Sequence, residues 1–170
     1  HILFTQLRPA SDWTIGTQIY ATHAQEEYRA MPANKRDFDN NAWHFAMDAT
    51  WKGERWSSKT GIGYTDAQKA NEVGFYPRHM SKNSRGTFIS MAYAGDDYLR
   101  DGELMFANMT EYRLTPDLGV GLVGNIAQFN YKGNHVRSGE INAFTRWAPT
   151  DAYLKNFTFW AMFGPGWSYK

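Results

Sequence analysis

A strict period of two in the hydrophobic pattern is the feature of this sequence that most limits its fold. Successive side chains of a β-strand point to opposite faces, so a half-buried strand alternates apolar residues with polar or small ones. The stretch 42–52 follows this rule over its whole length, and its apolar parity carries Trp43, Phe45, Met47, Ala49 and Trp51. Helical spacing at i, i+3 and i+4 is matched nowhere convincingly in the chain. The pattern therefore predicts strands.

The same alternation recurs along most of the chain and predicts about ten strands. We expect them over residues 1–8, 12–24, 42–52, 56–65, 72–80, 86–94, 103–114, 118–131, 140–148 and 155–168. No composition shift, repeat or linker divides the chain. Residues 1–170 are therefore expected to form a single all-β domain, built as an antiparallel up-and-down barrel or as a segment of a larger one.

The charge balance and the lack of cysteine count against several classes of function. Eighteen Lys and Arg against seventeen Asp and Glu give a net charge of +1, whereas nucleic-acid binding normally leaves a basic excess. Without Cys, the chain has no disulfide scaffold, cysteine zinc site or thiol chemistry. A mean hydropathy of −0.61 and the absence of a long apolar run argue against a membrane-spanning helix. Strands of a membrane barrel remain compatible, because alternation averages out as polar.

Strand length and aromatic placement favour a barrel in lipid over a barrel in water. Most of the predicted strands are longer than the five or six residues usual in globular sheets, and about 9–11 residues are needed to cross a bilayer. Aromatic residues make up 16% of the chain, and many lie on the apolar parity near strand ends, where interface girdles require them. The expected membrane-interface anchors are Trp13, Trp43, Trp51, Trp56, Tyr64, Tyr112 and Trp147, with Phe157 as a further aromatic of this kind.

The connections between predicted strands alternate in length. The short ones are 9–11, 53–55, 81–85 and 115–117, the medium ones 66–71 and 149–154, and the long ones 25–41, 95–102 and 132–139. Short turns on one side and longer loops on the other are typical of barrels in the outer membrane of Gram-negative bacteria, where the short turns are periplasmic. With this alternation of short and long connections, both chain ends would lie on the outer side of the membrane. The alternation thus predicts an internal stretch of a larger barrel.

Three short segments resemble a known group of bacterial outer-membrane barrel proteins. They are Trp51-Lys52-Gly53-Glu54-Arg55-Trp56, Asn71-Glu72-Val73-Gly74-Phe75-Tyr76-Pro77-Arg78 and Tyr112-Arg113-Leu114-Thr115-Pro116-Asp117-Leu118-Gly119. The third is similar to strand–turn–strand segments of porins. Longer members of the group carry an amino-terminal β-sandwich that resembles carbohydrate-binding modules. The resemblance implies an outer-membrane, porin-like barrel and implies no catalytic residues.

Charged residues lie on the polar parity of two predicted strands, 103–114 and 140–148. In a membrane barrel this parity faces the lumen, so the expected lumen-lining residues are Glu103, Glu111, Arg113, Glu140 and Arg146. Mutual pairing of these charges across strands is the simplest interpretation, and a constriction that selects solutes is the alternative. On this basis we predict a passive channel or structural component that is not an enzyme. Its partners would be the lipid bilayer and other outer-membrane or surface proteins, with no nucleic acid, metal or cofactor.

Two other classes of function remain open from the sequence. A soluble β-barrel would turn its apolar face inward and bind an apolar ligand there. An outer-membrane enzyme would need a group such as Ser57, Ser58, His44 and Asp48 at the barrel rim. His1 with a second histidine (His44, His79 or His135) would be required for an amino-terminal copper site. The glycines between Gly119 and Gly124 lie in an apolar strand and indicate close packing or a bend more than phosphate binding.

Overall fold

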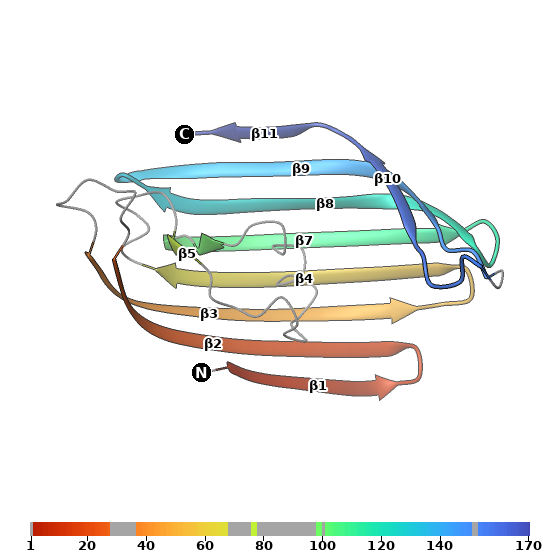
Figure 1. Cartoon of the computed structure of the whole chain (residues 1–170), viewed down its shortest axis with the longest axis horizontal. Coiled ribbons are helices and arrows are strands. Elements are labelled where there is room, and N and C mark those ends of the chain that lie inside the picture. Colours follow the sequence, from red (N-terminus) through yellow and green to blue (C-terminus); the bar gives the residue numbers. More distant parts are fainter. Residues whose placement is uncertain (1, 28–36, 68–75, 78–97, 100, 151–152) are drawn as a thin grey trace.

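The structure is a computed structural model that describes residues 2–27, 37–67, 76–77, 98–99, 101–150 and 153–170. These residues form eleven strands (Figure 1). The strands are β1 (Ile2–Ala10), β2 (Trp13–Glu27), β3 (Asp37–Lys52), β4 (Trp56–Ala67), β5 (Tyr76–Pro77), β6 (Tyr98–Leu99), β7 (Asp101–Arg113), β8 (Leu118–Tyr131), β9 (Asn134–Trp147), β10 (Phe159–Phe163) and β11 (Gly166–Tyr169). The described residues contain no helix, and so none that could cross a membrane.

Nine of the strands form one antiparallel sheet. Its order is β1-β2-β3-β4-β7-β8-β9-β10, and β11 also pairs with β9. β5 and β6 form a separate two-stranded sheet. The predicted all-β, antiparallel fold is therefore confirmed, with consecutive long strands side by side as in an up-and-down arrangement.

The strands β10 and β11 behave as one strand with a break at Gly164 and Pro165. Both pair with β9 in the same register. The carbonyl of Pro165 accepts a hydrogen bond from the amide of Ile141 at 3.1 Å, so the ladder continues across the break. Gly164 lies so close to β9 that a Cβ would collide with the carbonyl of Ile141. The sheet is thus eight strands wide, with β1 at one edge and β10–β11 at the other.

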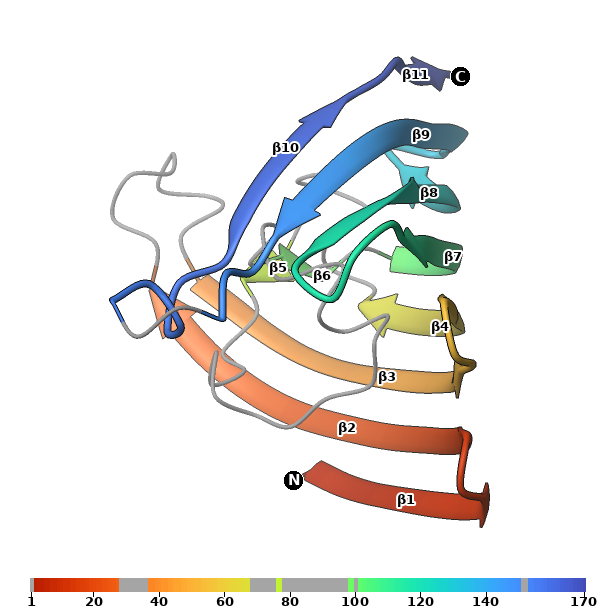
Figure 2. The same ribbon diagram turned by 90° about the vertical axis from the view of Figure 1, so that its right-hand side faces the viewer.

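The sheet is strongly curved and open. Figure 2 shows it bending around β5 and β6, which lie on its concave side, and β6 contacts β4. The two edge strands do not pair with each other in the described structure. A closed barrel is thus absent from the described residues, although the number of strands is close to the ten expected.

Outside two register shifts, between Leu7 and Ala10 in β1 and between Asp101 and Leu104 in β7, the pairing keeps the two parities apart and gives the sheet two distinct faces. The covered face, here called the inner face, carries mainly small and polar residues, with the buried apolar side chains of Met105, Val136 and Phe144 among them. Its other buried side chains include Gln18, Ala46, His44, Thr65 and Ala107. The opposite face, the outer face, exposes large apolar side chains. They include Ile19, Phe45, Met47, Ile62, Leu104, Phe106, Leu122, Ile126 and Ile141, all at least 37% exposed.

The connections differ at the two ends of the sheet. Three of them, at residues 11–12, 53–55 and 114–117, are short and share one end, here called the turn end. At the other end, the loop end, β2 finishes and β3 begins, and both chain termini lie there too (Figure 1). The predicted short turns at 53–55 and 115–117 are confirmed.

The predicted long loop over 132–139 is wrong. β8 and β9 are joined by Lys132 and Gly133 alone, and both have positive φ angles, 49° and 75°. Two such residues make the tight hairpin turn that matches the twist of the flanking strands. Sequence reasoning missed the first half of β9 because residues 134–139 contain few apolar side chains to mark the alternation.

Other strand boundaries also differ from the predicted ones. β2 and β3 extend into the predicted loop over 25–41, and the strand predicted over 155–168 begins at Phe159. The predicted strands 72–80 and 86–94 lie almost wholly outside the described residues, apart from Tyr76–Pro77. The link 81–85 also lies outside them.

Glycines on the inner face of β8 make room for side chains of the neighbouring strands. A Cβ on Gly119 would collide with the carboxylate of Glu111 on β7. A Cβ on Gly121 would collide with the carbonyl of Thr110 and would lie 2.7 Å from the ring of Phe144 on β9. The glycine run of β8 therefore serves close packing, as the sequence indicated.

We expect Gly121→Ala to lower the free energy of unfolding by about 1–3 kcal/mol, because a backbone carbonyl and a packed ring cannot both move away. Urea unfolding followed by tryptophan fluorescence measures the loss. Gly133→Asn is the control, since a Cβ there meets nothing within 4 Å and Asn tolerates a positive φ, so a change within about 0.5 kcal/mol is expected. Equal losses in the two variants would contradict the close packing of β8.

Candidate functional site

A row of buried polar side chains crosses the inner face near the loop end. His44 of β3, Thr65 of β4 and Glu103 of β7 are consecutive partners in register and are each at most 2% exposed. His44 Nδ1 and Thr65 Oγ1 share a hydrogen bond of 2.7 Å. Gln18 of β2, also buried, lies two residues away from the position opposite His44. Buried polar groups need such partners to offset the loss of water.

A second polar feature, an ion pair, lies on the inner face toward the turn end. The Arg146 guanidinium contacts Glu111 Oε1 through Nη2 at 2.6 Å and donates a hydrogen bond to it from Nε at 2.7 Å. The two residues belong to β9 and β7, so the pair spans β8 at the level of Gly119. The side chains are 18% and 9% exposed. This partial burial strengthens the attraction and makes loss of either partner costly.

The five predicted lumen-lining residues share the inner face but have different surroundings. Glu103 is buried, and Glu111 and Arg146 pair with each other. Arg113 donates from Nη2 to the carbonyls of Gly53 and Glu54, at 3.0 and 2.5 Å, and so fixes the turn between β3 and β4. Glu140 is exposed and accepts a hydrogen bond from the Asn125 amide at 2.8 Å.

The residues considered for an enzymatic or metal site are not brought together. Ser57 pairs with Lys52 and lies eight positions along β4 from Thr65, the partner of His44. Ser58 points to the outer face and Asp48 to the inner face, by register. His1 and His79 lie outside the described residues. Within the described ranges no three His, Cys, Asp or Glu side chains are grouped to hold a metal ion.

All seven predicted interface aromatics lie on the outer face, and they form pairs. At the turn end Trp13 is the register partner of Trp51, and the rings of Trp56 and Tyr112 are 4.8 Å apart. At the same end Trp147 stacks on Phe159 at 5.4 Å. At the loop end the rings of Trp43 and Tyr64 are 5.1 Å apart. Sequence reasoning did not foresee the neighbour-to-neighbour stacking, which follows from the register.

The turn-end aromatic row runs obliquely across the strands. Trp51 of β3 is paired with Ser58, which is two residues from Trp56. On β8, the partner of Tyr112 and the partner of Trp147 are two residues apart. The row makes these two steps, about 13.6 Å along the strands, over the four strand intervals from Trp51 to Trp147 or the six from Trp13 to Phe159, each interval being about 4.8 Å. The strands are therefore tilted by about 25–35° from the normal to this row.

On β3 and β4, the turn-end aromatic row and the loop-end pair of Trp43 and Tyr64 are separated by the same distance along the strand. Trp43 and Trp51 on β3 are eight residues apart, as are Tyr64 and Trp56 on β4. This separation is about 27 Å along a strand. Between the rows, the outer-face positions of the described strands carry no Asp, Glu, Lys or Arg.

A polar cluster interrupts the outer face on β4 and β7, about halfway along the band. Asn108 donates its amide to Thr60 Oγ1 at 2.7 Å and to Ser58 Oγ at 3.3 Å. The Thr110 hydroxyl donates to Asn108 Oδ1 at 3.1 Å and lies 3.1 Å from Ser58 Oγ. The cluster was not foreseen, although Asn108 and Thr110 visibly break the apolar parity of their strand.

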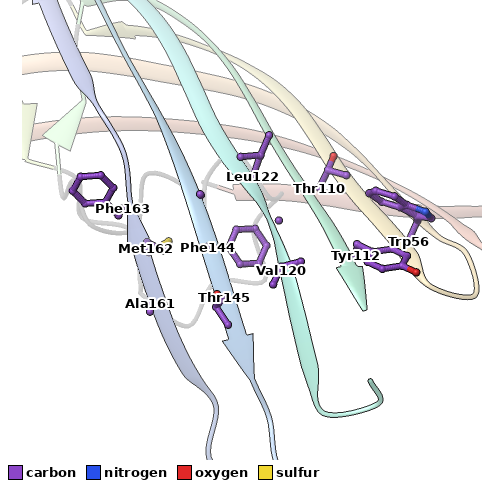
Figure 3. Close-up of a pocket in the computed structure, with 12 residues that line it drawn as sticks. Trp56, Thr110, Tyr112, Val120, Leu122, Phe144, Thr145, Ala161, Met162 and Phe163 are labelled. Carbon is purple, nitrogen blue, oxygen red and sulfur yellow. The ribbon is translucent and has the colours of Figure 1, made fainter. Parts of the chain in front are cut away.

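A groove of about 790 Å³ opens on the outer face beside this cluster (Figure 3). Its outer-face lining belongs to two adjacent rows of side chains across β4, β7, β8, β9 and β10. Trp56 and Tyr112 stand at one side and Phe163 at the other, with the small residues Ala143 and Ala161 among those between. The groove exists because small side chains here adjoin large aromatic ones.

A cation is held at the aromatic end of the groove. Arg55, which is exposed, donates from Nη1 to the Tyr112 hydroxyl at 3.2 Å. This hydrogen bond raises the pKa of the Arg55 guanidinium above its ordinary value. The surrounding turn is closed by a hydrogen bond from the Gly53 amide to the Trp56 carbonyl at 2.8 Å. The Arg113 amide donates to the Arg55 carbonyl, also at 2.8 Å.

The fold and its faces define a curved antiparallel β-sheet with a polar inner face and an apolar, aromatic-edged outer face. No family model, curated protein or solved structure matches the chain.

Removing the charged side chain of Arg146 should lower the free energy of unfolding far more than removing that of an exposed arginine. We expect Arg146→Leu to lower the free energy of unfolding by about 3 kcal/mol, because the Glu111 carboxylate is then left largely buried without its partner. The double variant Glu111→Leu with Arg146→Leu should recover part of this loss.

The control for this prediction is Arg137→Leu. Arg137 is exposed and donates to Gln128 at 3.2 Å, so its removal should cost under about 1 kcal/mol. Urea titration of all four proteins makes the comparison. Equal losses for Arg146→Leu and Arg137→Leu would show that the inner-face pair contributes nothing beyond a surface contact.

Proposed function

We propose that this chain forms the wall of a β-barrel in the outer membrane of a Gram-negative bacterium, where it acts as a channel or structural component. The observation that carries the proposal is the polarity of the sheet, which is reversed relative to a water-soluble barrel. Its covered inner face holds Gln18, His44, Thr65 and Glu103, while its outer face exposes large apolar side chains. Lipid is the solvent in which that arrangement is stable.

The size of the outer face supports this assignment. Seven intervals of about 4.8 Å between strands and about 27 Å between the aromatic rows give an apolar surface of about 900 Å² in projection. The largest apolar patch of a typical soluble monomer covers about 300–600 Å². A surface of this size without a charged residue would drive association in water, whereas a bilayer covers it.

The dimensions of the band between the aromatic rows also fit a bilayer. With a tilt near 30°, the 27 Å along the strand correspond to about 23 Å along the membrane normal, close to the apolar band of about 25 Å in outer-membrane barrels. The inferred tilt falls near the 35–45° of such barrels. Tilted strands that cross a flat interface require a row of anchors that steps along the sheet, as the row from Trp51 to Trp147 does.

The edge strands are compatible with a closed wall. β1 and β10–β11 run in opposite directions, as neighbours in an up-and-down barrel must. In a membrane, unpaired edges are costly because no water can satisfy their amides and carbonyls. We therefore propose that these edges are paired in the bilayer, with each other or with further strands.

The alternative function, a soluble barrel that binds an apolar ligand inside, is less well supported. Its ligand would need an apolar inner face, whereas the described inner face combines alanines and the apolar side chains of Met105 and Phe144 with the buried polar side chains of Gln18, His44, Thr65 and Glu103. The enzymatic rival would need a grouped set of reactive side chains at a rim. His44, Ser57 and Ser58 do not form one in the described structure.

Single cysteines test the orientation of the two faces, because the natural chain contains none. Ile141 on the outer face and Glu140 on the inner face are neighbours in β9 and both exposed. In lipid vesicles we expect Glu140→Cys to react with a water-soluble maleimide and Ile141→Cys to be protected, with both reacting fully after unfolding in urea. The physical reason is that lipid excludes the reagent from the outer face.

Equal labelling of the two cysteines in vesicles would contradict the membrane assignment. A protein that stays monomeric in water without detergent and shows no heat-dependent shift on a gel would contradict it as well. Protection of Glu140→Cys with labelling of Ile141→Cys would mean that the faces are reversed, as in the soluble alternative.

The channel function makes a separate prediction about charge. Of the five predicted lumen-lining residues, Glu140 is the one that is exposed to solvent. If it lines an aqueous passage, Glu140→Lys should shift the selectivity of conductance across a planar bilayer toward anions. Glu54→Lys, on the exposed turn, is the matched control and should have little effect. If the natural protein shows no conductance, the channel function is rejected and the structural role remains.

A further inference from the structure

The outer-face groove has a direction relative to the two aromatic rows. Its Tyr112 end belongs to the turn-end row, because Tyr112 stacks on Trp56. Its other end is at Phe163, four residues along β10 from Phe159, which pairs with Trp147 in the same row. Phe163 is therefore about 13 Å deeper along the strand than the row. The groove thus descends from the level of the anchors into the apolar band.

The lining suits a flexible hydrocarbon chain. Apart from two threonines and the polar tips of Tyr112 and Trp56, the side chains around the groove are apolar. The Thr110 hydroxyl is already engaged by Asn108, and the Tyr112 hydroxyl accepts from Arg55. Small side chains at Ala143 and Ala161 lie along its length, and Phe163 is 88% exposed at its deep end. Figure 3 shows these side chains spread along adjacent strands.

The shallow end of the groove carries a fixed positive charge. The Arg55 guanidinium is hydrogen-bonded to the Tyr112 hydroxyl, and the turn that presents it is tied to β7 through Arg113. A guanidinium presents a planar set of donors that matches the oxygens of a phosphate. A cation at the anchor level beside an apolar groove is complementary to a molecule with an anionic head and an apolar tail.

We propose that this groove binds one phospholipid, with an acyl chain lying from Tyr112 toward Phe163 and the phosphate held by Arg55. The proposal rests on the membrane assignment above. The ligand is a phospholipid of the leaflet at the turn end. Free phosphate would lack the apolar contacts, and a lipid without phosphate would lack the contact with Arg55.

Retention of lipid by the full chain in detergent micelles, counted by native mass spectrometry, tests the proposal. The probes are phosphatidylglycerol, diacylglycerol, which has no phosphate, and glycerol phosphate, which has no acyl chain. We expect one phosphatidylglycerol to be retained in preference to either partial molecule. Arg55→Gln should weaken its retention about tenfold, and Ala161→Trp, which fills the groove, should abolish it.

Two matched variants serve as controls. Arg137→Gln removes an arginine at the loop end of the outer face, and Ala21→Trp adds an indole to the exposed outer face of β2. Both should retain phosphatidylglycerol like the natural chain. Arg55 lies on an exposed turn, so its variant remains informative even if Ala161→Trp fails to fold.

Three outcomes would overturn the proposal. The first is equal retention of diacylglycerol and phosphatidylglycerol, and the second is unchanged retention in both Arg55→Gln and Ala161→Trp. The third is a change of oligomeric state in Ala161→Trp without loss of lipid, which would assign the groove to a second copy of the chain. Cysteine labelling separates this failure from failure of the membrane assignment. If Ile141→Cys is protected in vesicles and no lipid is retained, only the groove proposal is wrong.

Discussion

The parity-preserving register of the main sheet is the constraint on which the rest of the structure depends. Apart from a register shift between Leu7 and Ala10 in β1 and another between Asp101 and Leu104 in β7, the pairings from β1 to β11 place apolar parity opposite apolar parity, so two faces extend over eight strand positions. A slip of one residue in a single pairing would carry the outer-face side chains of all later strands to the inner face. Register therefore decides the polarity of the whole wall as well as local hydrogen bonding, and both proposed functions of the outer face derive from it.

The inner face solves a packing problem that the curvature of the sheet creates. Side chains on the concave side converge, and glycine and alanine leave room for the few long ones that remain. The absence of a side chain on Gly119 allows Arg146 to reach Glu111 across β8. The same principle places Phe144 over Gly121. Polar groups on this face can thus satisfy one another across a strand.

Alternation in the sequence was sufficient to predict the strand class, the two faces and the shared face of the seven aromatic residues, because these depend on parity alone. It was insufficient for the start of β9, where polar residues hide the period and only the pair Lys132-Gly133 marks the turn. Pairings between strands distant in the chain, such as Glu111 with Arg146, depend on register and could not be derived from spacing. The groove likewise requires knowledge of which small residues become neighbours on different strands.

The polar cluster around Asn108 is the severest test of an apolar solvent for the outer face, because an unpaired amide or hydroxyl in hydrocarbon costs several kcal/mol. Within the cluster the Asn108 amide reaches Thr60 and Ser58, and its carbonyl oxygen accepts from Thr110. The amide also lies 3.3 Å from the carbonyl of Lys59. Polar groups that bond to one another in this way offset the absence of water. A midband cluster built from four short side chains on two paired strands is therefore compatible with lipid, whereas a lone asparagine at the same position would not be.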